Sequence, residues 1–157
     1  GGGLVYGSLL KLRDDGAPMP AAACSFSACT DLALTGDTLR TNHEADPMVL
    51  AEGLQPVAEW YLGPLPATTP YASPIYADLR GLPPALLQVG STEVLLDDSR
   101  RMAERLEAAG VRADLRIWPD MPHVWQGCAS FLPEARAALA EAGQFLDRHV
   151  RDVTKAA

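Results

Sequence analysis

The most constraining feature of the sequence is a pair of short strand-like runs on either side of one helical pattern. The run 85–90 reads Ala-Leu-Leu-Gln-Val-Gly, carries no charge and ends in glycine, as a buried strand does. A second strand-like run covers 113–118. Between them a helix is expected from about Leu95 or Asp98 to Ala109. Strands joined through one helix pair in parallel by a right-handed crossover, so the sequence predicts an α/β fold.

The rest of the chain continues this alternation. The other expected elements are a buried helix over 4–13, an uncharged strand over 21–29, a short helix over 37–42 with Asp37 as its N-cap, a helix over about 49–62 and a last amphipathic helix from Pro133 to about Val150. Between residues 63 and 84 the chain carries six prolines and several large apolar residues, which indicates an ordered surface excursion. We therefore expect one domain with three parallel strands flanked by helices.

Composition and charge narrow the classes of partner. A net charge of −7 in 157 residues and a pI near 4.8 argue against nucleic acid or an anionic membrane surface, and leave a small neutral or apolar partner open. Neither a membrane-spanning apolar run nor a signal peptide is visible. Three cysteines fit a reducing compartment, so we expect a cytoplasmic protein. Cys24 and Cys29 lack partners for a zinc site and are interpreted as small buried hydrophobes.

Two residues with acid–base chemistry follow the two clearest strands. Glu93 comes just after the run 85–90, and His123 follows two prolines in the loop after the run 113–118. Neighbouring parallel strands lie about 5 Å apart, so the two side chains can meet at the carboxyl edge of the sheet. An imidazole that acts as a general base needs a carboxylate to fix its tautomer. Glu93 and His123 are therefore the candidate catalytic pair.

Other acids and histidines are weaker candidates. Asp97 and Asp98 rival Glu93 by residue type, but we expect them in the first turn of the next helix, where acids favour the helix dipole. His43 and His149 have no comparable loop or acid context and are expected at the surface.

Several motifs occur together in one order along the chain. They read DLALTG at 31–36, ASPIYADL at 72–79, GLPP at 81–84, QVGSTEVLLDDS at 88–99 and MPH at 121–123. This series resembles the hormone-sensitive-lipase-like carboxylesterases of the α/β-hydrolase fold over nearly the full length. The resemblance implies a partial α/β-hydrolase fold and a Ser-His-Glu triad with Glu93 as the acid and His123 as the base. It implies no metal or cofactor.

The start of the chain bears on the nucleophile. Gly1-Gly2-Gly3 followed by Leu4 looks like the tail of the family's G-D-S-A-G-G-G turn, although an unrelated flexible start would also explain it. The resemblance then implies a nucleophilic serine two residues before Gly1, and an H-G-G-G oxyanion loop further upstream. Residues 1–157 would be the C-terminal part of one catalytic domain. We expect this part alone to be inactive, and its strand over 21–29 to present an exposed apolar edge.

The expected function is hydrolysis of small carboxylic esters. Val94, Val124 and Trp125 adjoin the acid and the base, so they are candidates to line an acyl pocket, although simple loop packing explains them equally well. The helix that follows Asp46–Leu50 could roof the site. A non-catalytic small-molecule-binding protein on the same scaffold, or a hydrolase of amides or lactones, remains an alternative. The oligomeric state stays open.

Overall fold

The computed structural model describes the backbone of residues 1–156 and the side chains of residues 1–151. Helices and strands alternate in the predicted order. The elements are α1 (Gly2–Asp14), β1 (Ala23–Phe26), α2 (Thr38–Thr41), α3 (Ala51–Leu62), the 3-10 turn η1 (Pro74–Tyr76), β2 (Ala85–Gly90), α4 (Leu96–Ala108), β3 (Ala113–Trp118), the 3-10 turn η2 (Trp125–Cys128) and α5 (Pro133–Ala156).

The three strands form one parallel sheet in the order β1-β2-β3. The bounds predicted for β2 and β3 are confirmed, and their register runs from Ala85 opposite Ala113 to Gly90 opposite Trp118. The strand expected over 21–29 is shorter, with only four residues. It ends because Ser27 takes a left-handed backbone conformation, with φ of 47°, which turns the chain out of the sheet.

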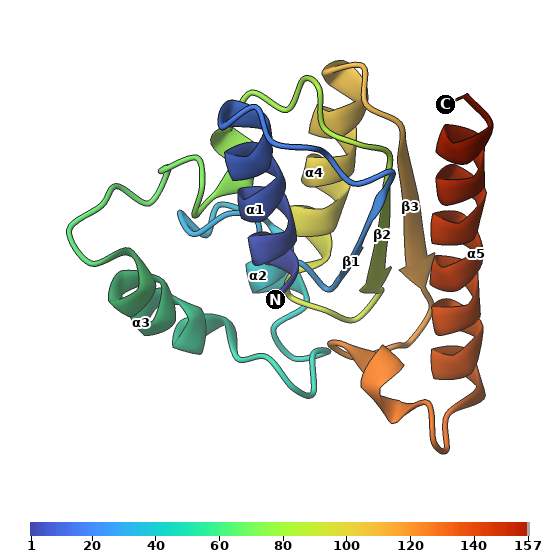
Figure 1. Ribbon diagram of the computed structural model, residues 1–157. Coiled ribbons are helices and arrows are strands. Elements are labelled where there is room, and N and C mark those ends of the chain that lie inside the picture. The colour runs from blue at the N-terminus through green and yellow to red at the C-terminus, as the bar shows by residue number, and fades with distance from the viewer. Residues whose placement is uncertain (157) are drawn as a thin grey trace.

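Helices cover both faces of the sheet (Figure 1). The α1 and α4 helices lie on one face, where Leu87 packs in a buried cluster with Tyr6 and Met102. The α5 helix covers the other face, where Leu86 packs with Phe145. Successive residues of β2 thus point to opposite layers, as the twofold period of a strand requires, and both sides are apolar because both are covered.

The short helix α2 corrects one expectation. Asp37 precedes it as predicted, but the Asp37 side chain makes no capping hydrogen bond. The carboxylate of Asp97 does this instead, since its Oδ2 accepts the Thr38 N–H at 3.0 Å across the fold. A tertiary contact therefore replaces the local cap that the sequence suggested.

The remaining segments agree with the predicted organisation. The proline-rich stretch between α3 and β2 is anchored by buried residues, among them Ile75 and Leu79. The α5 helix extends beyond the expected end, to Ala156. In the part of the chain that the structure describes, no helix is long and apolar enough to cross a membrane.

Candidate active site

Glu93 lies in the turn between β2 and α4, and its side chain is completely buried. Two donors hold one carboxylate oxygen: the Gly90 N–H reaches Oε1 at 2.6 Å, and the Ser27 hydroxyl donates to the same atom at 2.7 Å. A buried carboxylate is costly unless hydrogen bonds satisfy it, and these two donors do so. They leave Oε2 to face the next loop.

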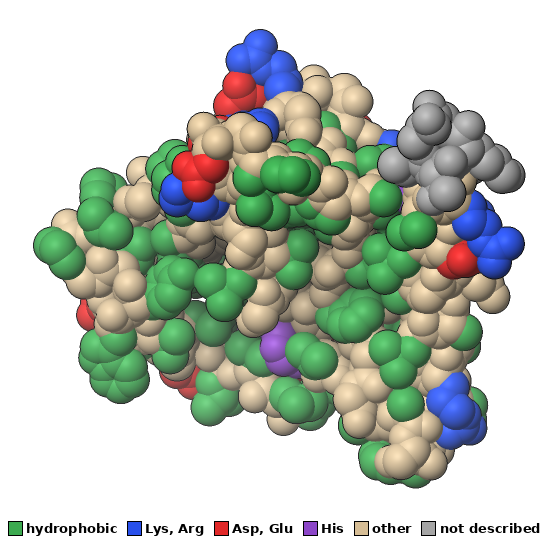
Figure 2. All heavy atoms as spheres, in the orientation of Figure 1, with side chains coloured by type: hydrophobic (Ala, Val, Ile, Leu, Met, Phe, Trp, Pro, Cys, Tyr) green, Lys and Arg blue, Asp and Glu red, His purple; other side chains and the backbone are tan. Residues whose placement is uncertain are grey.

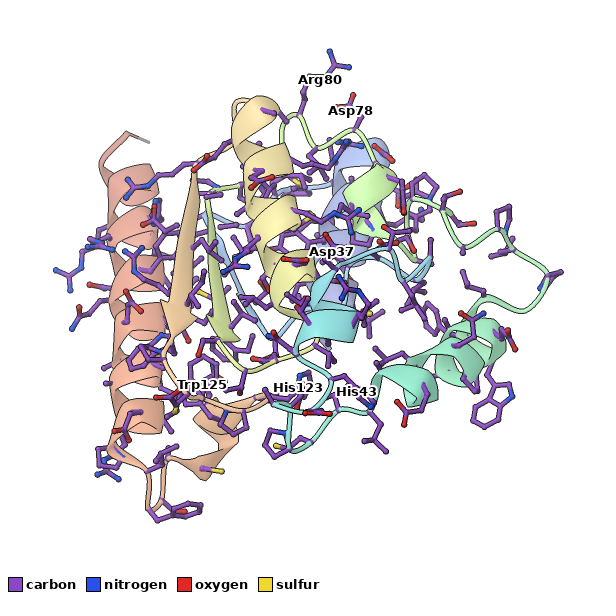
Figure 3. All side chains as sticks on the ribbon, turned by 180° about the vertical axis from the view of Figure 1, so that it is seen from behind. Asp37, His43, Asp78, Arg80, His123 and Trp125 are labelled. Atoms are coloured by element: carbon purple, nitrogen blue, oxygen red, sulfur yellow. The ribbon has the colours of Figure 1, made fainter. Side chains whose placement is uncertain are left out.

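His123 lies in that next loop, which connects β3 to η2. Two hydrogen bonds tie the loop to the β2–α4 turn: the Ser91 hydroxyl accepts the Asp120 N–H at 2.9 Å, and the Thr92 hydroxyl donates to the Met121 carbonyl at 2.9 Å. Figure 3 shows His123 beyond the arrowheads of the strands, whereas Asp78 and Arg80 lie at the opposite end of the molecule. The imidazole therefore sits at the carboxyl edge, where sites form on parallel sheets.

The structure brings the predicted pair together. Nδ1 of His123 lies 3.0 Å from Oε2 of Glu93, within hydrogen-bonding range. The His123 side chain is 26% exposed, whereas that of Glu93 is sealed from solvent. Because Nδ1 is engaged by the acid, Nε2 is the nitrogen that can exchange a proton with a bound group. This geometry is the one that a general base oriented by a carboxylate requires.

A cavity of about 700 Å³ lies next to this pair. His123 and Val124 border it on one side, and the backbone at Gly1–Gly3 borders it at the start of α1. Apolar residues of α3, including Leu54 and Val57, form another part of its wall. Figure 2 shows apolar side chains gathered around a hollow on this face. Such a lining suits an uncharged, largely apolar ligand.

The two rival acids serve other parts of the fold. Asp98 is buried and its Oδ2 accepts the backbone N–H groups of Thr30 and Asp31, at 2.6 and 3.0 Å. Burial raises the pKa of the Asp98 carboxyl to about 7, although those two hydrogen bonds oppose the shift. Asp97 bonds the start of α2. Both carboxylates therefore fasten the β1–α2 segment to α4.

The three residues predicted to be possible pocket residues differ in whether they border the cavity. Val124 borders the cavity and is partly exposed, as expected. Val94 and Trp125 follow the alternative of simple packing, because both are fully buried and neither borders that cavity. Val94 packs inward while its N–H donates to Asp46, and Trp125 packs beside Trp118 with ring centroids 5.8 Å apart. Proximity in sequence did not give the direction of these side chains.

The structure also corrects the expectations for the other histidines and for two of the cysteines. His43 is exposed as expected, but it does have an acid nearby, with Nδ1 3.5 Å from Glu52. His149 packs on Phe145 in α5. Cys24 and Cys29 are free and only partly buried, and both border the cavity. Within residues 1–151, no group of three or more His, Cys, Asp or Glu side chains is placed to hold a metal ion.

Two residues that the sequence did not single out complete the site. Ser27 bonds Glu93 and also accepts the Val124 N–H at 3.0 Å. Asp46 is buried and accepts three backbone N–H groups, from Met48, Val49 and Val94, at 2.9 to 3.0 Å. The only sequence signals were a polar residue within the uncharged run 21–29 and an Asp before a proline, which is a common turn pattern.

A parallel sheet covered on both faces, with a carboxylate–histidine pair at its carboxyl edge beside an apolar cavity, defines the class of α/β hydrolases. The family model described as "alpha/beta hydrolase fold" matches residues 1–127. The chain belongs to the hormone-sensitive-lipase-like carboxylesterase family of this fold, as its sequence motifs indicated.

Named relatives agree with this assignment. An acetyl-hydrolase of Streptomyces hygroscopicus is 42% identical over 146 residues, which are 93% of this chain and 49% of that protein. An esterase of Acinetobacter venetianus is 37% identical and matches 92% of this chain and 48% of its own length. A crystal structure of an esterase from the bacterial hormone-sensitive lipase family superposes with a TM-score of 0.93 at 49% identity, covering 96% of this chain and 50% of that one. The chain thus spans about half the length of these relatives.

Proposed function

We propose that residues 1–157 form the C-terminal part of a serine carboxylesterase and supply the acid and the base of its Ser-His-Glu triad. The observation that carries this proposal is the 3.0 Å contact between Nδ1 of His123 and Oε2 of Glu93 beside an apolar cavity. In the proposed reaction a serine upstream of Gly1 attacks the ester carbonyl, and Nε2 of His123 takes the serine proton and returns it to the leaving alcohol. Glu93 orients the imidazole and stabilises its charged form.

The position of the chain start supports the place of the nucleophile. Gly1–Gly3 open the α1 helix and border the same cavity as His123. A residue just before Gly1 would therefore enter the site near the imidazole, at the N-terminal end of a helix, where a developing negative charge is favoured. The glycines also permit a close approach, because a β-carbon on Gly3 would collide with the Cys29 carbonyl.

The proposed substrate is a small uncharged ester. The proposed location of the protein is the cytoplasm. The apolar cavity supports an uncharged ligand, and the net charge of −7 disfavours an anionic one. A solved relative, EstE5, which is 45% identical with a TM-score of 0.91, was soaked by p-nitrophenyl butyrate. Val124 is the residue next to the base that would contact the acyl or alcohol group.

The test is to express the complete reading frame that contains this chain and to measure turnover of p-nitrophenyl butyrate. We expect esterase activity that falls by roughly 10³-fold or more in His123→Ala, since a triad without its base retains only a small residual rate. No turnover in the wild type, together with binding of the ester, would favour the non-catalytic binding protein. Faster turnover of an amide or lactone would favour the other acyl-bond hydrolase.

A further inference from the structure

The hydroxyl of Ser27 is hydrogen-bonded to Glu93 and to the backbone of the residue that follows His123. It donates to Oε1 of Glu93 at 2.7 Å and accepts the N–H of Val124, the residue after His123, at 3.0 Å. Together with the His123–Glu93 contact, these bonds close a ring through Ser27, Glu93, His123 and Val124. His123 is thus held by its side chain and also by the peptide that follows it.

The backbone around this ring is unusual at two positions. Ser27 has φ of 47° and Val124 has φ of 51°, both in the left-handed region. This conformation is especially unfavourable for Val124, because its side chain is branched at the β-carbon. Ser27 is 3% exposed, so water does not compete for its hydroxyl. The hydrogen bonds of the ring therefore offset the free-energy cost of a backbone conformation that the loop would not adopt alone.

We propose that Ser27 is a positioning residue for the Glu93–His123 pair. Its hydroxyl fixes the rotation of the Glu93 carboxylate so that Oε2 faces Nδ1, and it holds Val124 in the conformation that presents the imidazole. The kinetic consequence of this assignment rests on the proposed esterase function, whereas the structural consequence does not.

The size of the expected effect follows from what remains when the hydroxyl is lost. The Gly90 N–H still donates to Oε1, so Glu93 keeps one fixed donor. Val124 loses the acceptor of its N–H and with it the restraint on its left-handed backbone. A small displacement of a catalytic group lowers the rate of the chemical step by up to about 100-fold. We therefore expect a partial loss of kcat with little change in KM.

The kinetic experiment uses the complete protein and p-nitrophenyl butyrate. Ser27→Ala removes the hydroxyl and keeps the β-carbon, whereas Ser27→Gly removes the hydroxyl and is free to adopt the left-handed backbone, so it folds without that strain. We expect both to lower kcat about 10- to 100-fold with KM within about twofold of the wild type. The matched control is Ser99→Ala, because Ser99 is buried in α4 and its hydroxyl has no partner among the described side chains. Its kcat is expected to be unchanged.

A second measurement does not depend on turnover. The Nδ1 proton of His123 bonded to Glu93 is expected to give a low-field proton resonance in the wild type and in Ser99→Ala, and to shift upfield or disappear in both Ser27 variants. Wild-type kcat in Ser27→Gly would overturn the proposal, because the hydroxyl would then be dispensable. An unchanged low-field resonance, or its absence from the wild type, would overturn it too. If the wild type shows no turnover, the esterase proposal fails and the resonance alone decides the role of Ser27.

Discussion

At the scale of single residues, the sequence indicates which side chains meet at the site, but not the contacts that depend on a local turn of the backbone. Residue type and spacing predicted that Glu93 and His123 meet, because both follow neighbouring parallel strands whose carboxyl ends share one edge of the sheet. The 3.0 Å contact confirms this meeting. The same reasoning could not find Ser27, whose role depends on a turn of the backbone at the end of β1. It also left open whether Val94 and Trp125 line the pocket or pack the loops, and the burial of both favours packing.

The assignment of the acid predicts unequal effects for neighbouring carboxylates. Glu93→Gln in the complete protein should lower kcat by roughly 10³- to 10⁴-fold, since the amide no longer stabilises the imidazolium or fixes its tautomer. Asp97→Asn is the control, because Asp97 bonds the start of α2 and not the imidazole. Steady-state kinetics of the two variants test which carboxylate is the acid. A larger loss of kcat in Asp97→Asn than in Glu93→Gln would contradict the assignment of Glu93.

The buried carboxyl of Asp98 predicts a dependence of stability on pH. Its pKa is raised from 3.8 to about 7, mainly by burial, so the folded state keeps a proton that the unfolded state has already lost. Asp98 therefore contributes stability that is fully present below about pH 4 and is lost as the pH rises toward 7. Urea unfolding of the complete protein between pH 4 and 8 should show this slope, and Asp98→Asn should remove it. Equal slopes in the two proteins would contradict the inference.

At the scale of elements, the sequence predicted strand bounds best where the local pattern is clear, both for the buried strand β2 and for the partly exposed strand β3. The bounds of β2 and β3 follow from short uncharged or alternating runs that end at Gly90 and Trp118. Local patterns were less informative where distant groups decide the outcome. The cap of α2 comes from Asp97 on α4, and β1 ends at Ser27 because that residue turns toward Glu93. Neither contact has a signature in the local sequence.

Replacing glycine with alanine should have opposite effects on stability at two positions, one where β2 meets the His123 loop and one in α5. A β-carbon on Gly90 would collide with the Met121 carbonyl, so Gly90→Ala should displace the loop and destabilise the protein by about 1–3 kcal/mol. Gly143 lies in α5 with open space around it, so Gly143→Ala should stabilise by about 0.5–1 kcal/mol. Chemical unfolding of both variants measures the difference. Equal stabilities would show that the loop can move aside without cost.

At the scale of the whole molecule, the described residues present surfaces that suit a larger protein. The α3 helix lies apart from the sheet (Figure 1), and its Trp60 and Tyr61 side chains are 82% and 58% exposed. The β1 strand is an edge of the sheet, beside the start of α1. The chain also spans about half the length of its relatives. These features support the proposal that further residues of the complete protein cover this face.

This view predicts how residues 1–157 behave when expressed alone. If the nucleophile lies upstream of Gly1 as proposed, they should show no triad-type hydrolysis above background. The exposed Trp60 and Tyr61 side chains and the edge position of β1 should promote aggregation. Size-exclusion chromatography, dye binding to apolar surface and a p-nitrophenyl butyrate assay test this directly. A soluble monomer that unfolds cooperatively would contradict the predicted aggregation, and turnover abolished by His123→Ala would contradict the predicted inactivity.

The separation of α3 from the sheet has a consequence for protein engineering. Glu93, His123 and Ser27 all lie at the edge of the sheet, whereas Leu54 and Val57 reach the cavity from a helix outside that framework. Random libraries aimed at new ester preferences can therefore vary α3 with little risk to the chemistry. Changes in the length of the loop between β3 and η2 would break the ring and, under the proposed function, would lower activity toward every ester.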